Sequence, residues 1–238
     1  MDSLRSYDSM NEYKADWLNL AFPHIVLISG KCYYSTNSER VMLKDAEVNR
    51  IVRETWLSGY EYGRKLVFGD LTSVKDVSGV FQDNAVIETF DEFKCFTGLN
   101  DVPDYCFSSC TALRSIRIPQ KSVRIGKMAF NHCTSLTHVE IPEGVENLDD
   151  NAFNSCTSLT SIVVPKSVSR IGNWLWVHCT SLKEVTFLRE TPPDFSIGTM
   201  FSDCPSLESI YVPKQSVRAY QNHRRIAMFY KDLVKPIP

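Results

Sequence analysis

The sequence predicts a repeat solenoid, a stack of similar coils, rather than a globular domain. Cysteines at positions 110, 133, 156 and 179 follow one another at intervals of 23 residues. In each case an aromatic residue stands three positions before the cysteine and a leucine three positions after it. A fifth version, around Cys204, follows after a longer step of 25 residues. Self-similarity at a fixed period of this length is typical of solenoids, in which each coil buries its apolar side against its neighbours.

Within one coil, the apolar residues predict two short strands on opposite walls of a core. Alternate residues of a strand point to opposite faces, so Val163 should face outward between two inward neighbours. Pro165 should end that strand, because proline has no N–H to donate to the next coil. Gly172 is expected to allow a turn with positive φ, and a tight helical or 3₁₀ corner should complete the coil. The residues expected to face inward are Leu159, Ile162, Val164, Val168 and Ile171.

The repeated cysteines are interpreted as buried, reduced thiols. A free cysteine packs as a small apolar residue with a weak S–H donor, and stacking would place each one in a corner lined by aromatic rings. Disulfides are disfavoured, because a periodic column gives each cysteine two equivalent neighbours. Zinc is disfavoured, because no C-x-x-C occurs, and His132 and His178 adjoin cysteines and are expected on an exposed corner. Cys32, and to a lesser degree Cys95, lie outside the column and are expected to be the reactive thiols.

One longer pattern points to a family. The string F-x-x-C-T-S-L-T-S-I, followed by V-P and I-G-x-x-A-F, resembles the BspA-like (treponemal-type) leucine-rich repeat family over residues 107–213. The resemblance implies a leucine-rich-repeat right-handed superhelix, a β-rich α/β fold of about five to six 23-residue coils with caps at both ends. It also implies a role in adhesion or protein binding, because the family is known from bacterial cell-surface and secreted proteins. Three features depart from the pattern: Trp176 for Phe, Leu188 for Pro, and the longer corner at Thr191-Pro192-Pro193, expected to form a stiff bulge.

The sequence divides into three predicted parts. The repeats should span residues 81–215, because Phe81 and Asn84 begin a weaker coil in which asparagine takes the place of cysteine. Terminal repeats of solenoids are commonly degenerate, since one side meets a cap. Residues 1–80 are predicted to form an N-terminal segment and helical cap, and residues 216–238 a C-terminal helical cap.

Short elements are expected outside the repeats. Ser216 should N-cap a helix that runs towards Tyr230, with the basic residues 223–225 on its solvated face rather than in an anion site. Nearer the N-terminus, an amphipathic helix at residues 13–20 and a strand at 25–29 are expected.

The segment before the repeats is similar to the EF-hand or dockerin arrangement found in relatives of this repeat family. Helices are expected at residues 45–56 and 74–81. The loop is degenerate: its first, third, fifth and last ligand places align with Gly59, Glu61, Gly63 and Asp70, which leaves at most two carboxylates. We expect a metal-free relic that serves as the N-terminal cap, and no cofactor.

Charge and motifs argue against several classes of function. A net charge of -2 and a pI near 6.2 give no case for nucleic acid binding. The longest apolar run, residues 25–28, is far too short to span a membrane, and the first residues do not resemble a secretory signal. The location stays open: the cell surface or secretion if a leader was removed, otherwise the cytoplasm. Without G-x-S-x-G, H-E-x-x-H or a glycine-rich phosphate loop, we expect no enzyme.

Two kinds of function remain. The first is a monomeric protein-binding or adhesion module that uses the outward strand positions, with a host or cell-envelope protein as partner. The second is a structural spacer of a cell-envelope or phage-like assembly, without a ligand of its own. The outward positions are mixed and mostly small, which weakens the claim to a tight protein site. They are Ser115, Arg117, His138, Glu140, Ser161, Val163, Glu184, Thr186, Ser209 and Tyr211.

Overall fold

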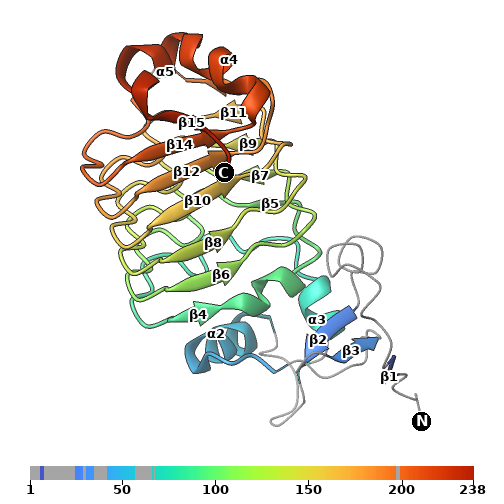
Figure 1. Ribbon diagram of the computed structural model, residues 1–238. Coiled ribbons are helices and arrows are strands. Elements are labelled where there is room, and N and C mark those ends of the chain that lie inside the picture. Colours follow the sequence, from blue (N-terminus) through green and yellow to red (C-terminus); the bar gives the residue numbers. More distant parts are fainter. Residues whose placement is uncertain are drawn as a thin grey trace.

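The computed structural model shows a solenoid of stacked coils with helices at both ends (Figure 1). It describes residues 42–56, 66, 68–196 and 199–238, and the backbone of three short strands at residues 6–7, 25–28 and 31–34. Each regular coil contributes one strand to each of two walls, and the core lies between the walls. The repeat solenoid predicted from the sequence is confirmed.

The first wall carries seven parallel strands, whose outward side we call the strand face. They stack as β4, β6 and β8 in one hydrogen-bonded sheet and as β10, β12, β14 and β15 in another. Every pairing within these two sheets is parallel and in register from coil to coil. The strands are β4 (Thr89–Phe90), β6 (Ser115–Arg117), β8 (His138–Glu140), β10 (Ser161–Val164), β12 (Glu184–Phe187), β14 (Ser209–Val212) and β15 (Val234–Pro236).

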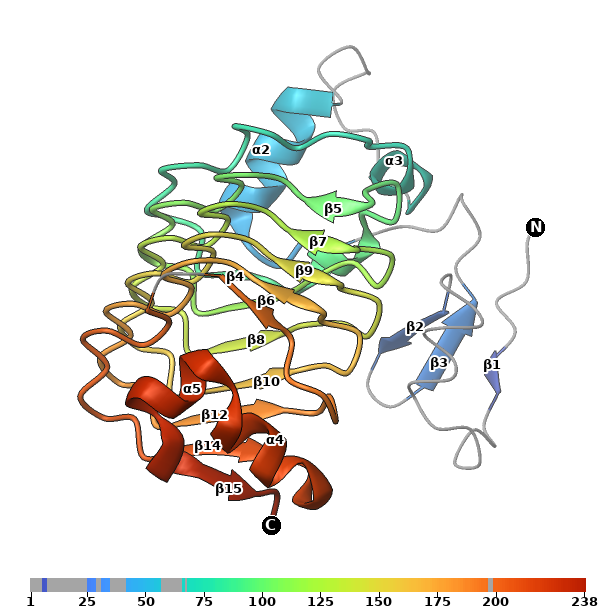
Figure 2. The same ribbon diagram turned by 90° about the horizontal axis from the view of Figure 1, so that it is seen from above.

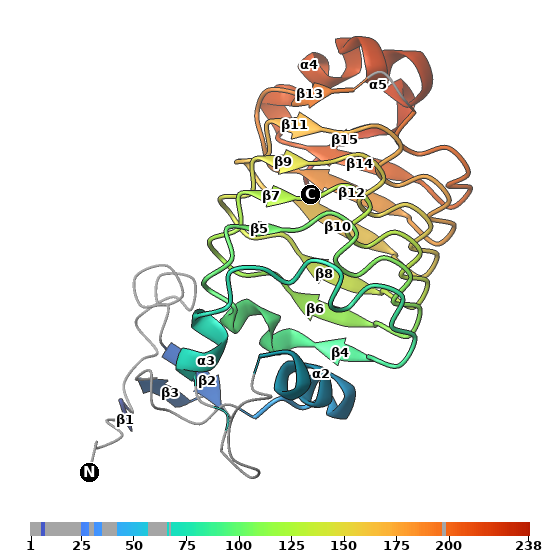
Figure 3. The same ribbon diagram turned by 180° about the vertical axis from the view of Figure 1, so that it is seen from behind.

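The second wall is one continuous five-stranded parallel sheet, seen from behind in Figure 3. Its strand order is β13-β11-β9-β7-β5, so consecutive coils are always neighbours. Such regular stacking lets each coil satisfy the backbone of the next. The strands are β5 (Asp101–Val102), β7 (Arg124–Ile125), β9 (Asn147–Leu148), β11 (Arg170–Ile171) and β13 (Asp194–Phe195).

The core follows the predicted alternation. All five residues expected to face inward are buried, whereas Val163 is 51% exposed, and β10 ends just before Pro165. Aromatic residues of neighbouring coils stack on one another, with ring centroids 5.3 Å apart for Phe81 and Phe107 and 5.3 Å for Phe130 and Phe153. Trp176 stacks in the same way on Phe201, at 5.2 Å. These contacts bury the largest side chains of the repeats.

The corners differ from the expectation at Gly172. They are chains of turns rather than helical or 3₁₀ segments, and the positive φ falls on non-glycine residues such as Trp174, at 53°. Gly172 instead allows close packing, because a Cβ there would lie 2.4 Å from the backbone nitrogen of Asp150 in the preceding coil. Gly126 is packed in the same way on Asp104. Each aspartate accepts a hydrogen bond from the backbone N–H that follows the glycine, so Asp and Gly alternate along the stack.

The N-terminal cap contains helix α2 (Ala46–Trp56), which was predicted, and the shorter α3 (Phe68–Thr72). The predicted helix at residues 74–81 is wrong. Asp76 accepts a hydrogen bond from the backbone N–H of Ser78, and Gly79 has a φ of 69°, so this segment folds into turns. A 3₁₀ helix, η2 (Asp91–Cys95), follows β4.

Asp45 ties α2 to the first coil. Its Oδ1 accepts from the backbone N–H groups of Glu47 and Val48 and so caps α2. Its Oδ2 accepts from the N–H groups of Glu88 and Thr89, which have no preceding coil to bond to. The Asp45 carboxylate therefore provides the hydrogen-bond acceptor that a preceding coil would otherwise provide.

The C-terminal cap is built from short pieces. They are η3 (Lys214–Ser216), α4 (Val217–Asn222), α5 (Arg224–Phe229) and η4 (Lys231–Leu233), before β15. The single helix predicted up to Tyr230 is wrong, because His223 is extended, with φ −66° and ψ 127°. Its ring nitrogen accepts from the N–H of Arg225 and starts a second helix. Ser216 precedes α4, but its side chain makes no capping hydrogen bond.

The remaining strands form a small antiparallel sheet near the N-terminus, visible in Figure 2. Its order is β1 (Ser6–Tyr7), β3 (Lys31–Tyr34) and β2 (Ile25–Ile28), so the strand expected at 25–29 is confirmed. The helix expected at 13–20 and most of the degenerate EF-hand loop lie outside the described residues.

Candidate protein-binding site

The ten predicted face residues lie in two columns along the strand face. Neighbouring strands stand in register, so that Ser115 pairs with His138 and Arg117 with Glu140. The same two columns continue further along the stack. One contains Ser161, Glu184 and Ser209. The other contains Val163, Thr186 and Tyr211. The folded chain thus gathers onto one surface residues that are almost 100 positions apart in the sequence.

Ser209 is not exposed as predicted, because the C-terminal cap covers it. Only 4% of Ser209 is accessible, and its hydroxyl accepts from Nζ of Lys235 at 2.8 Å. Tyr211, opposite Lys235 on β15, is partly covered. The open part of the strand face therefore lies between β6 and β12.

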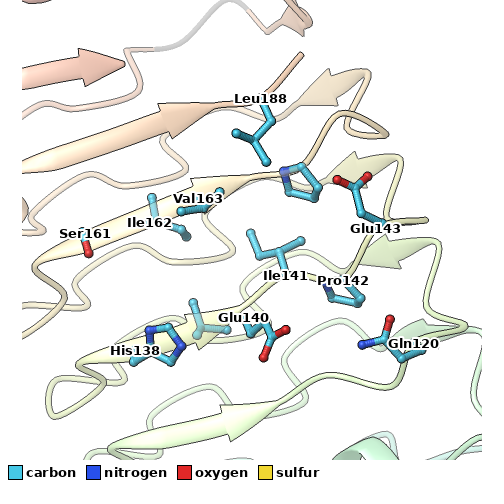
Figure 4. A pocket seen from close by; sticks show the side chains of 12 residues that line it. Gln120, His138, Glu140, Ile141, Pro142, Glu143, Ser161, Ile162, Val163 and Leu188 are labelled. Atoms are coloured by element: carbon cyan, nitrogen blue, oxygen red, sulfur yellow. The ribbon is translucent and has the colours of Figure 1, made fainter. Parts of the chain in front are cut away.

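The face is interrupted between β8 and β10. These strands belong to different sheets, and among the described residues no backbone hydrogen bond joins them. A groove of about 410 Å³ opens at this place (Figure 4). Four predicted residues line it: His138 and Glu140 from β8, and Ser161 and Val163 from β10.

The groove is a local opening, because the same two coils are joined at their other sides. The Cys156 thiol donates to the carbonyl of Phe130 at 3.2 Å, and the Thr157 hydroxyl donates to that of Thr134 at 3.2 Å. On the second wall, β9 and β11 pair normally. The rest of the coil holds the groove in place.

Other lining residues were missed by sequence reasoning. Ile141 and Ile162 belong to the floor, and Gln120, Glu143 and Leu188 extend the lining to the loops after the strands. One of them, Leu188, stands where the other coils have proline, but this departure does not by itself indicate a groove. Among the lining residues the charged ones are Glu140 and Glu143, and no Lys or Arg is present.

The thiol column is structural. Each thiol donates to the backbone carbonyl of the aromatic residue one coil back: Cys110 to Phe81 at 3.0 Å and Cys133 to Phe107 at 3.1 Å, for example. Burial raises the pKa of Cys110 to about 12. Cys95 was expected to be more reactive, but it is buried, and burial raises its pKa to about 11. These thiols are therefore protonated near neutral pH and poor nucleophiles.

No metal-binding group is found in the part of the chain that the structure describes. No three His, Cys, Asp or Glu side chains there are grouped to hold an ion. His132 and His178 are exposed at corners, and His178 lies 3.3 Å from a carboxylate oxygen of Asp203. No described helix is long and apolar enough to cross a bilayer.

Asp149 has a structural role that the sequence did not suggest. The Arg124 guanidinium donates to Asp149 at 2.6 Å and to Asp104 at 2.8 Å, and lies 3.7 Å from Asp101. The Asp149 carboxylate thus joins neighbouring coils through Arg124, and we call this arrangement the Arg124 tie.

The stacked parallel coils define a repeat solenoid protein with an exposed strand surface. The BspA-type leucine-rich repeat region matches residues 100–224 in six copies. The chain belongs to this family, and the resemblance seen in the sequence is confirmed. No curated protein matches the chain.

Several solved structures are similar to this chain. A leucine-rich repeat protein of T. pallidum is 32% identical, with a TM-score of 0.44 over 48% of this chain and 52% of that protein. One from Bacteroides ovatus is 28% identical, with a TM-score of 0.44 over 56% and 32%. The pneumococcal vaccine antigen PcpA is 16% identical, with a TM-score of 0.48 over 63% and 40%. The chain therefore spans about a third to a half of the length of these proteins.

Proposed function

We propose that this chain is a non-catalytic module that binds another protein through its strand face and thereby contributes to adhesion at a cell surface. The groove between β8 and β10 carries the proposal. There the regular ladder opens, and polar side chains surround an apolar floor at the centre of the predicted face. Binding sites in proteins are typically concave and apolar with a few placed polar groups.

The extended shape of the solenoid supports the same function. Repeats present side chains at fixed intervals on a continuous surface, which suits contact with another protein over a large area. The thiols, the Arg124 tie and the stacked aromatic residues are all used to hold coils together, which leaves the strand face for a partner.

The alternative is a spacer without a ligand of its own. One observation favours it: apart from Arg117, His138, Glu140, Val163 and Glu184, the face positions are small or partly covered. A spacer needs stable stacking and a soluble surface but no groove.

Affinity capture with matched variants separates the two. Three immobilised proteins are exposed to an extract of host-cell surface proteins: the parent, a test variant and a control. The test variant carries Arg117→Glu and Glu140→Arg on the strand face. The control carries Arg170→Glu on the second wall. Urea unfolding checks that all three are equally folded, since exposed positions cost within about half a kcal/mol. Proteins retained by the parent and by the control, but lost by the test variant, support the proposal. Equal capture by all three, or no capture by the parent, favours the spacer.

A further inference from the structure

We infer that the groove between β8 and β10 binds an extended peptide segment of the partner, with an aliphatic side chain next to a lysine or arginine. This inference rests on the proposed function and names the chemistry of the partner. Three observations carry it: unpaired strand edges, an apolar floor and a carboxylate rim.

The strand edges select a polypeptide. Elsewhere on this wall, consecutive coils are joined by bonds such as Thr137 N–H to the carbonyl of Arg114 at 3.1 Å and Lys183 N–H to that of Thr160 at 2.8 Å. Among the described residues, no such bond joins Thr160 to Thr137. Among the described residues, the backbone groups of β8 and β10 therefore border the groove without a hydrogen bond from one strand to the other. An extended peptide offers matching groups, as in recognition by strand addition.

The floor selects an aliphatic side chain. Ile141 and Ile162 lie at the base, with Val163 and Leu188 beside them (Figure 4). Val163 is 51% exposed, although its neighbours along β10 are buried. Covering these groups with an apolar side chain removes hydrocarbon surface from water, which is the main favourable term in association. A wholly polar segment would leave them uncovered.

The negative charge at the rim of the groove favours a basic side chain in the bound peptide, and its position sets the direction in which the peptide lies. Glu140 and Glu143 are the charged lining residues, and no Lys or Arg of the groove offsets them. Figure 4 places Glu143 beyond the ends of the strands, opposite the end where His138 and Ser161 stand. The basic residue of the partner should therefore lie at the carboxyl end of β8 and β10, with the aliphatic side chain over the middle.

Three labelled hexapeptides test the inference on the full chain by fluorescence anisotropy. The probe is Ser-Leu-Ser-Val-Lys-Lys, and the controls are Ser-Leu-Ser-Val-Glu-Glu and Ser-Ser-Ser-Ser-Lys-Lys. The probe should bind at least about tenfold more tightly than either control at low salt, and the preference over the acidic peptide should shrink as salt screens the rim. Equal affinities for the basic and acidic apolar peptides, or binding of none of the three, would overturn the inference.

Variants place the binding in the groove. The double variant Glu140→Gln, Glu143→Gln should remove the preference for the basic peptide, whereas Glu146→Gln, exposed beside β9 on the second wall, should not. Val163→Asp should weaken the probe at least about tenfold, whereas Val123→Asp, at an exposed valine beside β7 on the second wall, should have little effect. If Val163→Asp weakens both apolar peptides alike and the glutamine variant changes nothing, the groove binds but the charge assignment is wrong. Protein capture that persists without peptide binding refutes this inference alone and leaves the proposed function standing.

Discussion

Raising the pH should destabilise this protein unusually steeply between pH 8 and 9.5, because its thiols are buried. The seven described cysteines are all free and buried. Burial raises the pKa of Cys204 to about 11 and that of Cys133 well above its ordinary value of 9.0. In the unfolded chain these groups lose their protons near the ordinary value. The folded state then holds more protons than the unfolded state, so stability is full below that value and falls as the pH rises towards the folded pKa.

The magnitude follows from the number of thiols. Each one that stays protonated only in the folded state removes about 1 kcal/mol from the free energy of unfolding at pH 9.5 relative to pH 7. For the seven buried thiols, this amounts to about 7 kcal/mol, comparable with the whole stability of a small domain. Lysine and tyrosine titrate mainly above this range, which keeps the effect attributable to cysteine.

Urea unfolding at several pH values under a reducing agent measures this loss. The matched variant is Cys133→Ala with Cys156→Ala, which removes two thiols and keeps the rest. Its stability at pH 7 should be lower, but its loss up to pH 9.5 should be smaller than that of the parent by about 2 kcal/mol. The same pH dependence in both proteins would refute the role given to the buried thiols.

Three other outcomes are expected. In a Cys32→Ala variant, a maleimide reagent should label fewer than one thiol per chain until urea unfolds the protein; fast labelling of several would contradict the burial. Asp45→Ala should lower the free energy of unfolding by about 2 kcal/mol, because it removes a helix cap and the acceptor for two N–H groups, whereas Glu54→Ala on the exposed side of α2 should change it by less than about half a kcal/mol; equal effects in calorimetry would rule out the capping account. Gly172→Ala should cost about 1–3 kcal/mol, because the new Cβ meets the backbone of Asp150, and an unchanged melting temperature would show that the coils can separate there.

Much of the fold could be predicted because each coil repeats the same environment. Because one pattern occurs in five copies, the buried positions and the column of thiols could be predicted from it. The coil around Leu159 alone was enough to predict which residues face the core from each wall. The caps were harder, because each occurs once. The break at His223 depends on its packing against Phe195, with ring centroids 5.0 Å apart, a contact that links distant parts of the sequence.

The groove could not be predicted, although the four predicted face residues that line it are all exposed. The step from His138 to Ser161 is the regular 23 residues, so no insertion or proline marks the opened ladder. Gly172 was misassigned for a related reason. Its purpose depends on the residue lying one coil away, and a reading along a single coil does not show which side chains are stacked together.

The contact between aspartate and glycine recurs in every second coil, although the thiols and the aromatic residues recur in every coil. Asp104 and Asp150 are 46 positions apart, as are Gly126 and Gly172. Deleting the 23 residues 105–127 would bring Asp149 onto Asp104, with a side chain where the packing has no room for a Cβ. Deleting the 23 residues 127–149 would instead join Gly126 to Asp150 and keep both glycines on their aspartates. Loss of a single coil should therefore be tolerated only at certain breakpoints, so the corners restrict where the solenoid can be shortened.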